Sequence, residues 1–205
     1  MNPKYAPLFT PMRIGTCEIK NRVVLCAMEG TSIVDWLAQT RFNEHVHDYY
    51  IERARNEVGL IIPGMTPLRS MVFDKWLHRN PGAFRKVGPL MDEIHSYGAK
   101  VFFQLGAGFG RAFTLNRSMT KLIDYRFLGK AARKLINMDA LLVSASENPN
   151  VWMPEYPCRE LSREEIREFV EAYAGAALLC RDAGVDGIEV HAVHEGYLLD
   201  QFTTP

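Results

Sequence analysis

Four short apolar runs recur along this chain and are separated by segments with helical periodicity. Each run is almost wholly apolar and is bounded by polar residues or glycine, which is typical of a strand buried on both faces of a parallel sheet. The alternation of strand and helix predicts an α/β protein whose helices cover that sheet. The four predicted strands are residues 22–28, 58–65, 99–105 and 185–191.

Three segments between the runs carry the apolar stripe of an amphipathic helix. The first follows Asn43 as a candidate N-cap, and the second opens at Pro89 and ends at a glycine cap, Gly98. The third begins at a capping box formed by Ser162 and Glu165. Residues predicted to face the core are Val46, Tyr49, Tyr50 and Ala54, then Leu90, Met91, Ile94 and Tyr97, then Ile166, Phe169, Val170, Tyr173 and Ala177.

Two parallel architectures compete, an open doubly wound sheet and part of an eightfold barrel. The open sheet needs a glycine-rich loop after its first strand, whereas residues 29–36 hold one glycine. The stretch GAGFGR, residues 106–111, imitates a dinucleotide fingerprint, but the residues after it do not resemble the start of a helix. The barrel is favoured because unusual residues sit where the strands end, which is where barrels build their sites. These residues are Ala27, Met28 and Glu29, then Pro63, Gly64 and Met65, then Gln104, and finally His191, His194 and Tyr197.

Residues 111–157 form a segment that is too long for an ordinary connection and in which we expect no strand. We predict a lid or an inserted substrate loop within a single domain spanning residues 1–205. Seven basic residues and one acidic residue lie in its first part, so two interpretations stay open: a solvated helix face, or a lid that attracts an anionic substrate. The basic residues are Arg111, Arg117, Lys121, Arg126, Lys130, Arg133 and Lys134, and the acidic one is Asp124.

Charge and cysteine usage narrow the class of protein. Lysines plus arginines number 24 and aspartates plus glutamates 24, so no net field draws this chain to nucleic acid or to an anionic membrane. No apolar stretch approaches the length of a membrane span. The four cysteines show no metal-binding or disulfide spacing, which favours a reduced, cytoplasmic protein in which Cys26 is a small buried apolar residue.

Several long motifs, in order along the chain, resemble the Old Yellow Enzyme family of FMN-dependent ene-reductases and NADH:flavin oxidoreductases. The sequences GAGFGR and HAVHEGYLLDQF are similar to those of the branch that contains 2-enoate reductases, dienoyl-CoA reductases and bile-acid enone oxidoreductases. The matching stretches are LFTPMRIGTCEIKNRVVLCAM, YYIERARNEVGLII, HSYGAKVFFQL, CRELSREEIREFVEAYAGAALLCRDAGVDGIEVH and GYLLDQF.

The resemblance implies a TIM (β/α)8 barrel that uses FMN, with NADH or NADPH as reductant, to reduce the C=C bond of α,β-unsaturated carbonyl compounds. It places the backbone of Ala27 and Met28 against the flavin and the Gln104 side chain at the pyrimidine edge of the isoalloxazine ring. Met65 stands where many relatives have a small residue near the flavin, so it is expected to narrow the pocket.

The same resemblance makes His191 and His194 the donors to the substrate carbonyl oxygen and Tyr197 the proton donor to the α-carbon. The chemistry suits these residue types. Hydride delivery to the β-carbon leaves negative charge on the oxygen, which two fixed donors stabilise, and a phenol is protonated at neutral pH yet can give up its proton. Two other interpretations stay open, structural histidines and a metal site formed by His191, His194 and Glu195.

Three departures from the family pattern concern the site. Many relatives have proline at the position of Ala27, and many have a histidine soon after the glutamine that Gln104 matches. Glu195 is one extra residue between His194 and Gly196, which leaves open which histidine faces the substrate.

A complete barrel needs about 250 residues, so we expect this chain to form its amino-terminal half, about four β/α units. Strands five to eight, their phosphate-binding loops and a later basic residue near the flavin would then be missing, and flavin binding by the 205 residues alone is expected to be weak. A 4Fe-4S cluster and FAD are expected only in a longer full-length protein.

Three functions remain to be weighed against one another. The first is reduction of a small enone or enoate, whose anionic character is undecided. The second is a non-catalytic half barrel that self-associates through exposed edges. The third is a non-flavin barrel lyase or hydrolase, which is disfavoured because no lysine or metal triad ends the strands.

Overall fold

The computed structural model describes residues 2–35, 37–39, 42–115, 121 and 136–203. Its centre is a five-stranded sheet in which β3, β4, β6 and β5 are adjacent in that order and β9 also pairs with β6. Every pairing within this sheet is parallel, which confirms the predicted alternation of strands and helices. The strands are β3 (Val24–Leu25), β4 (Leu60–Ile61), β5 (Thr66–Pro67), β6 (Lys100–Gly106) and β9 (Gly187–Val190).

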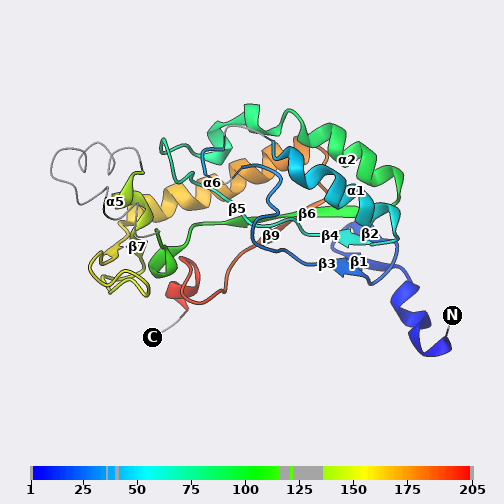
Figure 1. Ribbon diagram of the computed structural model, residues 1–205, viewed down its shortest axis with the longest axis horizontal. Coiled ribbons are helices and arrows are strands. Elements are labelled where there is room, and N and C mark those ends of the chain that lie inside the picture. Colours follow the sequence, from blue (N-terminus) through cyan, green and yellow to red (C-terminus); the bar gives the residue numbers. More distant parts are fainter. Residues whose placement is uncertain (1, 36, 40–41, 116–120, 122–135, 204–205) are drawn as a thin grey trace.

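Three helices, α1 (His47–Arg55), α2 (Val87–Ser96) and α6 (Arg163–Asp182), cover one face of the sheet (Figure 1). The main core lies between the two layers, where Val101, Phe103 and Leu105 of β6 are almost fully buried. These residues alternate along β6 with side chains that face away from the helices, because successive residues of a strand point to opposite faces. This arrangement leaves the second face of the sheet available for a site.

The predicted helix ends are largely confirmed. Ser162 and Glu165 form the reciprocal capping box at the start of α6. Gly98, after α2, has φ +74°, a left-handed conformation that glycine adopts without the clash that a side chain would cause. Two starts differ from the prediction: α2 begins at Val87 rather than Pro89, and Asn43 donates its side-chain N–H to the Ser32 carbonyl instead of capping a helix.

A hairpin closes the amino-terminal end of the sheet. Its strands β1 (Met12–Ile14) and β2 (Cys17–Ile19) are antiparallel and bring Ile19 against Leu60 and Phe102. The remaining elements of the described chain are short: η1 (Pro3–Phe9), η2 (Glu44–Val46), η3 (Leu77–Arg79), η4 (Pro81–Phe84), η5 (Gly110–Ala112), α5 (Met138–Leu141), β7 (Val143–Ser144), β8 (Arg159–Glu160) and η6 (Asp200–Phe202).

Three predictions about burial and strands are wrong. The first strand is shorter than predicted and is not buried on both faces. Among the described strands β3 pairs with β4 alone and lies at the sheet edge, so Val24 and Cys26 are exposed. Val170 lies 65% exposed because the buried stripe of α6 runs instead through Phe169, Ala172 and Ala176. The insertion also holds a strand, β7, which pairs in parallel with β8.

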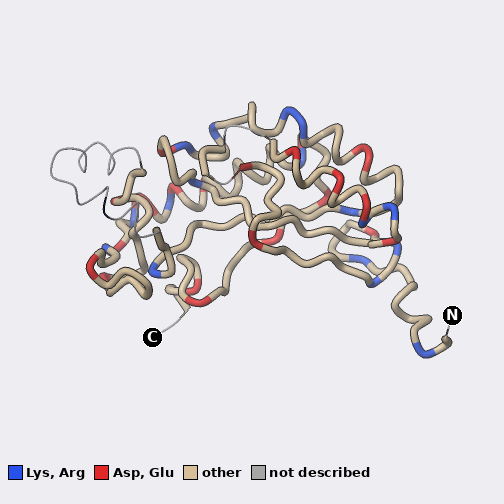
Figure 2. Tube along the Cα trace, viewed as in Figure 1, with Lys and Arg blue, Asp and Glu red and all other residues tan. Residues whose placement is uncertain are grey.

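Charge is spread along the described trace, with acidic and basic side chains interspersed (Figure 2). Of the seven basic residues predicted in the insertion, Arg111 and Lys121 are described, whereas Arg117, Arg126, Lys130, Arg133 and Lys134 lie outside the described residues. Among the described helices, none is both long enough and apolar enough to cross a membrane. No group of three or more His, Cys, Asp or Glu side chains in the described part of the chain is arranged to hold a metal ion.

Candidate functional site

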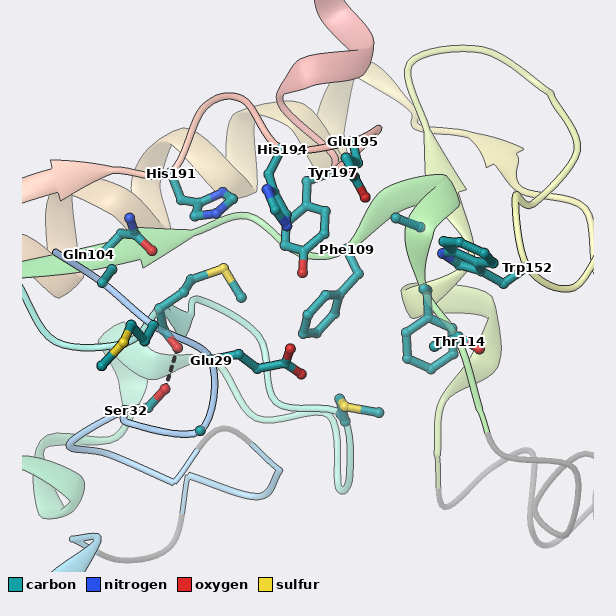
Figure 3. A pocket seen from close by; sticks show the side chains of 17 residues that line it. Glu29, Ser32, Gln104, Phe109, Thr114, Trp152, His191, His194, Glu195 and Tyr197 are labelled. Atoms are coloured by element: carbon teal, nitrogen blue, oxygen red, sulfur yellow. Dashed lines mark hydrogen bonds between the residues drawn. The ribbon is translucent and has the colours of Figure 1, made fainter. Parts of the chain in front are cut away.

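A cavity of about 430 Å³ opens beyond the carboxyl ends of the strands. All seven residues predicted for the site line it: Ala27, Met28, Met65, Gln104, His191, His194 and Tyr197. They come from the segments that follow β3 and β4, from β6 itself and from the segment that follows β9, and several of their side chains point into the same space (Figure 3). Parallel strands explain the convergence, because their carboxyl ends meet at one edge of the sheet.

The rings of His191, His194 and Tyr197 form one cluster. The His191 and Tyr197 rings are stacked with centroids 5.0 Å apart, and the His194 ring meets that of Tyr197 edge-on at 4.8 Å. His191 is anchored by its backbone N–H, which donates to the Leu105 carbonyl at 2.9 Å. The cluster therefore starts where β9 leaves the sheet, and both histidines lie beside the tyrosine.

A tight turn accommodates the extra residue Glu195. Glu195 and Gly196 have positive φ angles, +45° and +87°. The Gly196 N–H donates to the Asp200 carboxylate at 2.9 Å, and its carbonyl accepts a hydrogen bond from the Gln201 side chain. These bonds hold the turn so that the Tyr197 ring still reaches the cavity.

Burial shifts the pKa values of His191 and Tyr197 in this cluster. Desolvation lowers the pKa of His191 below its ordinary value of 6.5, and its Nδ1 atom is buried without a hydrogen-bond partner among the described residues. Desolvation also raises the pKa of Tyr197, and the carboxylates of Glu29 and Glu195 add to that rise. Near neutral pH the imidazole of His191 is therefore uncharged and the phenol of Tyr197 keeps its proton.

The opposite side of the cavity is formed by the ends of β3, β4 and β6. The Gln104 side-chain N–H donates to Glu189 at 2.6 Å. Met65 lies over Gly106, where an added Cβ atom would stand 2.2 Å from the Met65 sulfur, so glycine leaves room for that side chain. The Ser32 hydroxyl donates to the Met65 carbonyl at 2.6 Å and ties the loop after β3 to this wall.

Sequence reasoning missed several lining residues. Phe109 meets the Tyr197 ring edge-on at 5.2 Å, and Trp152 stands 62% exposed at the cavity. Phe109 lies within GAGFGR, whose position after a strand end was a usable signal, whereas nothing local marks Trp152. Glu29, named above only as one of the residues that follow the first strand, is exposed and lines the cavity.

Comparison with known proteins matches residues 7–205 to the NADH:flavin oxidoreductase / NADH oxidase family. The chain belongs to this family. Cinnamate reductase from Clostridium sporogenes is 39% identical over 98% of the chain, and NADH oxidase from Thermoanaerobacter brockii is 30% identical over 97%. The Old Yellow Enzyme structure from Pichia sp. AKU4542 superposes with a TM-score of 0.68 over 96% of the chain at 24% identity, which shows a shared fold.

The chain spans only part of each of these proteins: 28% of the cinnamate reductase, 27% of the NADH oxidase and 48% of the Old Yellow Enzyme chain. The parallel sheet with helices on one face is consistent with part of the barrel of these flavin enzymes. The cofactors of the NADH:flavin oxidoreductase family are FMN and a nicotinamide nucleotide.

The cavity fits a flat heterocycle such as the FMN ring. Its volume lies within the range of about 300–1,000 Å³ that is typical of small-molecule sites. Met28 and Met65 supply apolar surface, and Gln104 supplies hydrogen-bonding groups at an edge. Among the described lining residues the ionisable groups are Glu29, Glu195, Tyr197 and the two histidines, so the part of the wall that is described carries no Lys or Arg.

Proposed function

We propose that this chain contributes the substrate-activating half of an FMN-dependent oxidoreductase that reduces the C=C bond of α,β-unsaturated carbonyl compounds with NADH or NADPH. One observation carries the proposal. His191, His194 and Tyr197 converge in a single cavity with the end of β3 and with Gln104. Family membership supplies the reaction class that this arrangement supports.

In the proposed reaction FMN, when bound and reduced, supplies the hydride for the β-carbon of the substrate. His191 and His194 donate hydrogen bonds to the carbonyl oxygen and stabilise the negative charge that develops there. A neutral His191 can still donate one N–H, so its lowered pKa does not prevent this role. Tyr197 gives its proton to the α-carbon and regains one from solvent. Its raised pKa keeps the phenol protonated between turnovers.

Four residues are proposed to hold the flavin. The backbone of Ala27 and Met28 lies along the ring, Gln104 bonds its pyrimidine edge, and Met65 packs against it. This assignment is supported by their shared cavity and by the apolar character of three of the four side chains. Met65 is also proposed to narrow the space near the flavin, because many relatives have a smaller residue at this position.

The proposed substrate is a small enone or enoate, covered by residues 111–157 acting as a lid or substrate loop. Phe113, Thr114 and Trp152 of that segment line the cavity and support this role. An anionic substrate group stays an open alternative. Glu29 and Glu195 in the wall oppose it, whereas the basic residues of the insertion that would favour it lie outside the described residues.

We also propose a cytoplasmic location and no nucleic-acid or membrane partner, supported by four free thiols and a balanced formal charge. We place the chain nearest the branch of 2-enoate, dienoyl-CoA and bile-acid enone reductases. A 4Fe-4S cluster and FAD would belong only to a longer full-length protein.

An exposed apolar surface favours the alternative function, a non-catalytic half barrel that acts by association. Between α6, β9 and the residues after β9 lies a groove of about 530 Å³ whose lining is almost entirely apolar. Val170, Val190 and Phe202 are 65%, 51% and 48% exposed there. Self-association through this surface would produce a colourless oligomer, whereas tightly bound FMN with enone-dependent NADH oxidation would exclude the alternative.

The test of the proposed reaction is Tyr197→Phe in the completed, flavin-loaded barrel, followed under anaerobic conditions in two half-reactions. We expect flavin reduction by NADH to stay within about twofold, while reoxidation by an enone slows by about 10²–10⁴-fold through loss of the proton donor. Tyr173→Phe is the matched control, because Tyr173 is a half-buried tyrosine of α6 that does not line the cavity. If flavin reduction falls and reoxidation does not, the role of Tyr197 is wrong.

A further inference from the structure

We propose that Glu189 is a positioning residue that fixes the orientation of the Gln104 side-chain amide. In that orientation the amide presents its oxygen to a hydrogen-bond donor on the edge of the bound heterocycle. This inference rests on the proposed function, because the heterocycle is the FMN ring. It adds a residue that neither lines the cavity directly nor belongs to the cluster around Tyr197.

The sheet register brings the two side chains together. Gln104 on β6 pairs directly with Glu189 on β9, and directly paired residues of parallel strands point to the same face. Their neighbours Phe103 and Ile188 pack into the core beneath the helices, so Gln104 and Glu189 face away from it. His191 follows Glu189 by two residues and therefore continues on the same face.

The chemistry of the pair decides which way the amide points. Glu189 Oε1 accepts the hydrogen bond from Gln104 Nε2 at 2.6 Å, and an ionised carboxylate can only accept. The amide nitrogen must therefore face β9, because the reversed amide would set two oxygens against each other. Oxygen and nitrogen of a glutamine amide are otherwise nearly indistinguishable by shape, so this contact supplies the reason for one orientation.

The remaining groups of Gln104 then match one edge of a flavin. Its Oε1 accepts no hydrogen bond from the described residues and is free to accept from the N–H of the flavin pyrimidine ring. Its second N–H is free to donate to an adjacent carbonyl oxygen of that ring. Figure 3 shows Gln104 at the end of the cavity beside His191, where a ring edge can reach it. A bond to a charged acceptor is among the stronger hydrogen bonds in proteins, so it holds this arrangement before the cofactor arrives.

The first measurement needs no cofactor. Assigned NMR spectra of the Gln104 side-chain NH₂ are compared in the wild type, in Glu189→Gln, which keeps an acceptor oxygen, and in Glu189→Leu, which removes it. We expect one Gln104 amide proton to be shifted downfield in the wild type, to a smaller degree in Glu189→Gln, and not at all in Glu189→Leu. Identical Gln104 amide shifts in the wild type and Glu189→Leu would overturn the proposal.

The second measurement titrates FMN into the same three proteins and follows the Gln104 amide, since NMR detects millimolar as well as tight binding. We expect Glu189→Leu to weaken FMN binding about tenfold and Glu189→Gln by less than about threefold. Gln104→Leu lacks this amide, so FMN binding to it is followed by the backbone N–H signals of His191 and His194. Binding should be weakened similarly, and the double variant Gln104→Leu/Glu189→Leu should lose little more, because the two residues act as one unit.

The two measurements separate the two proposals. FMN binding that is equal in the wild type, Glu189→Gln and Glu189→Leu overturns the positioning role alone. The absence of any FMN-induced shift at millimolar FMN, in a wild type that shows the downfield amide proton, overturns flavin binding by this chain and with it the purpose assigned to Glu189.

Discussion

The amino-terminal and carboxyl ends of the paired strands β6 and β9 differ in how their buried polar groups are hydrogen-bonded. At the amino-terminal end, Asp186 accepts hydrogen bonds from Lys100 Nζ at 2.8 Å, from His95 Nε2 at 2.7 Å and from the Val101 backbone N–H at 2.9 Å. At the carboxyl end, His191 Nδ1 is buried without a partner among the described residues. The amino-terminal end satisfies the Asp186 carboxylate within the chain, whereas the carboxyl end leaves His191 Nδ1 without a partner among the described residues.

The electrostatics follow the same division. Burial raises the pKa of Asp186, but the hydrogen bonds from Lys100, Val101 and His95 more than offset that effect and hold the pKa below its ordinary value. At the other end burial lowers the pKa of His191, and neither a backbone hydrogen bond nor the charge of Glu189 offsets that effect. In barrels the amino-terminal face is associated with stability and the carboxyl face with chemistry, and the roles proposed for this chain follow that division across a single pair of strands.

The largest expected effect concerns two histidines at opposite ends. His191→Ala should slow enone reduction about 10²–10³-fold in the completed, flavin-loaded barrel, because it removes one donor to the developing negative charge, while the unfolding temperature stays nearly constant. His95→Ala should instead cost about 1 kcal/mol of unfolding free energy and leave the rate unchanged. Stopped-flow kinetics and thermal unfolding of both variants check this pair, and equal effects on the rate would remove the contrast between the ends.

Asp186→Asn should lower the free energy of unfolding by about 2 kcal/mol. This is less than the 3–5 kcal/mol typical of a broken buried ion pair, because the Lys100 and His95 side chains are 34% and 30% exposed. Urea unfolding from pH 7 downward checks the sign. The depressed pKa of Asp186 stabilises the fold above the unfolded-state pKa of about 3.9, and this contribution is lost as pH falls through the lower folded-state value. The variant should therefore show a flatter acid dependence than the wild type.

Ser162→Ala should cost about 1 kcal/mol of unfolding free energy, because it leaves the Glu165 N–H at the start of α6 without its side-chain acceptor. Glu165 is also bonded by Arg159, which, with the Ser162 N–H, lowers its pKa to about 2. Because α6 packs on the outer layer and not on the cavity, FMN affinity should not change. A loss of FMN affinity that parallels the loss of stability would show that the helix layer and the site are coupled.

The smallest effect on stability is expected from Val170→Ser, within about 0.5 kcal/mol, because the side chain is 65% exposed. The same change should reduce self-association if the apolar groove beside α6 is the contact surface. Sedimentation velocity over a range of concentrations measures this, with Val151→Ser as the control, since Val151 is 43% exposed but does not line that groove. Equal association of both variants and the wild type would exclude the groove as the contact.

Local sequence patterns were sufficient to predict much of the architecture. The capping box at Ser162 and Glu165 and the left-handed glycine at Gly98 were predictable because they depend on residues within one turn of a helix. The half barrel predicted from the sequence places its first strand at an edge, but the apolar run itself gave no sign of exposure, since such a run looks the same at an edge and at the centre of a sheet. Exposure of Val24 and Cys26 follows from that position and not from their chemistry.

The candidate site also has features that the sequence predicts and features that it does not. Parallel strand order alone predicts that Ala27, Met65, Gln104 and His191 end at one edge, and all four line one cavity. The partnership of Gln104 with Glu189 depends on strand register, which no local pattern specifies. Trp152 lines the cavity only because the long insertion, residues 111–157, follows a path that brings it there.

The sequence by itself determined the alternation of strands and helices, the family, and the residue types at the strand ends, because these depend on periodicity and on short motifs. Only the tertiary structure decided which polar groups are satisfied. Asp186 finds three donors and His191 Nδ1 finds no partner among the described residues, although both flank the same strand, β9. The physical reason is that hydrogen-bond satisfaction depends on which side chains from distant segments fill the space around a group, and that is fixed only when the layers pack.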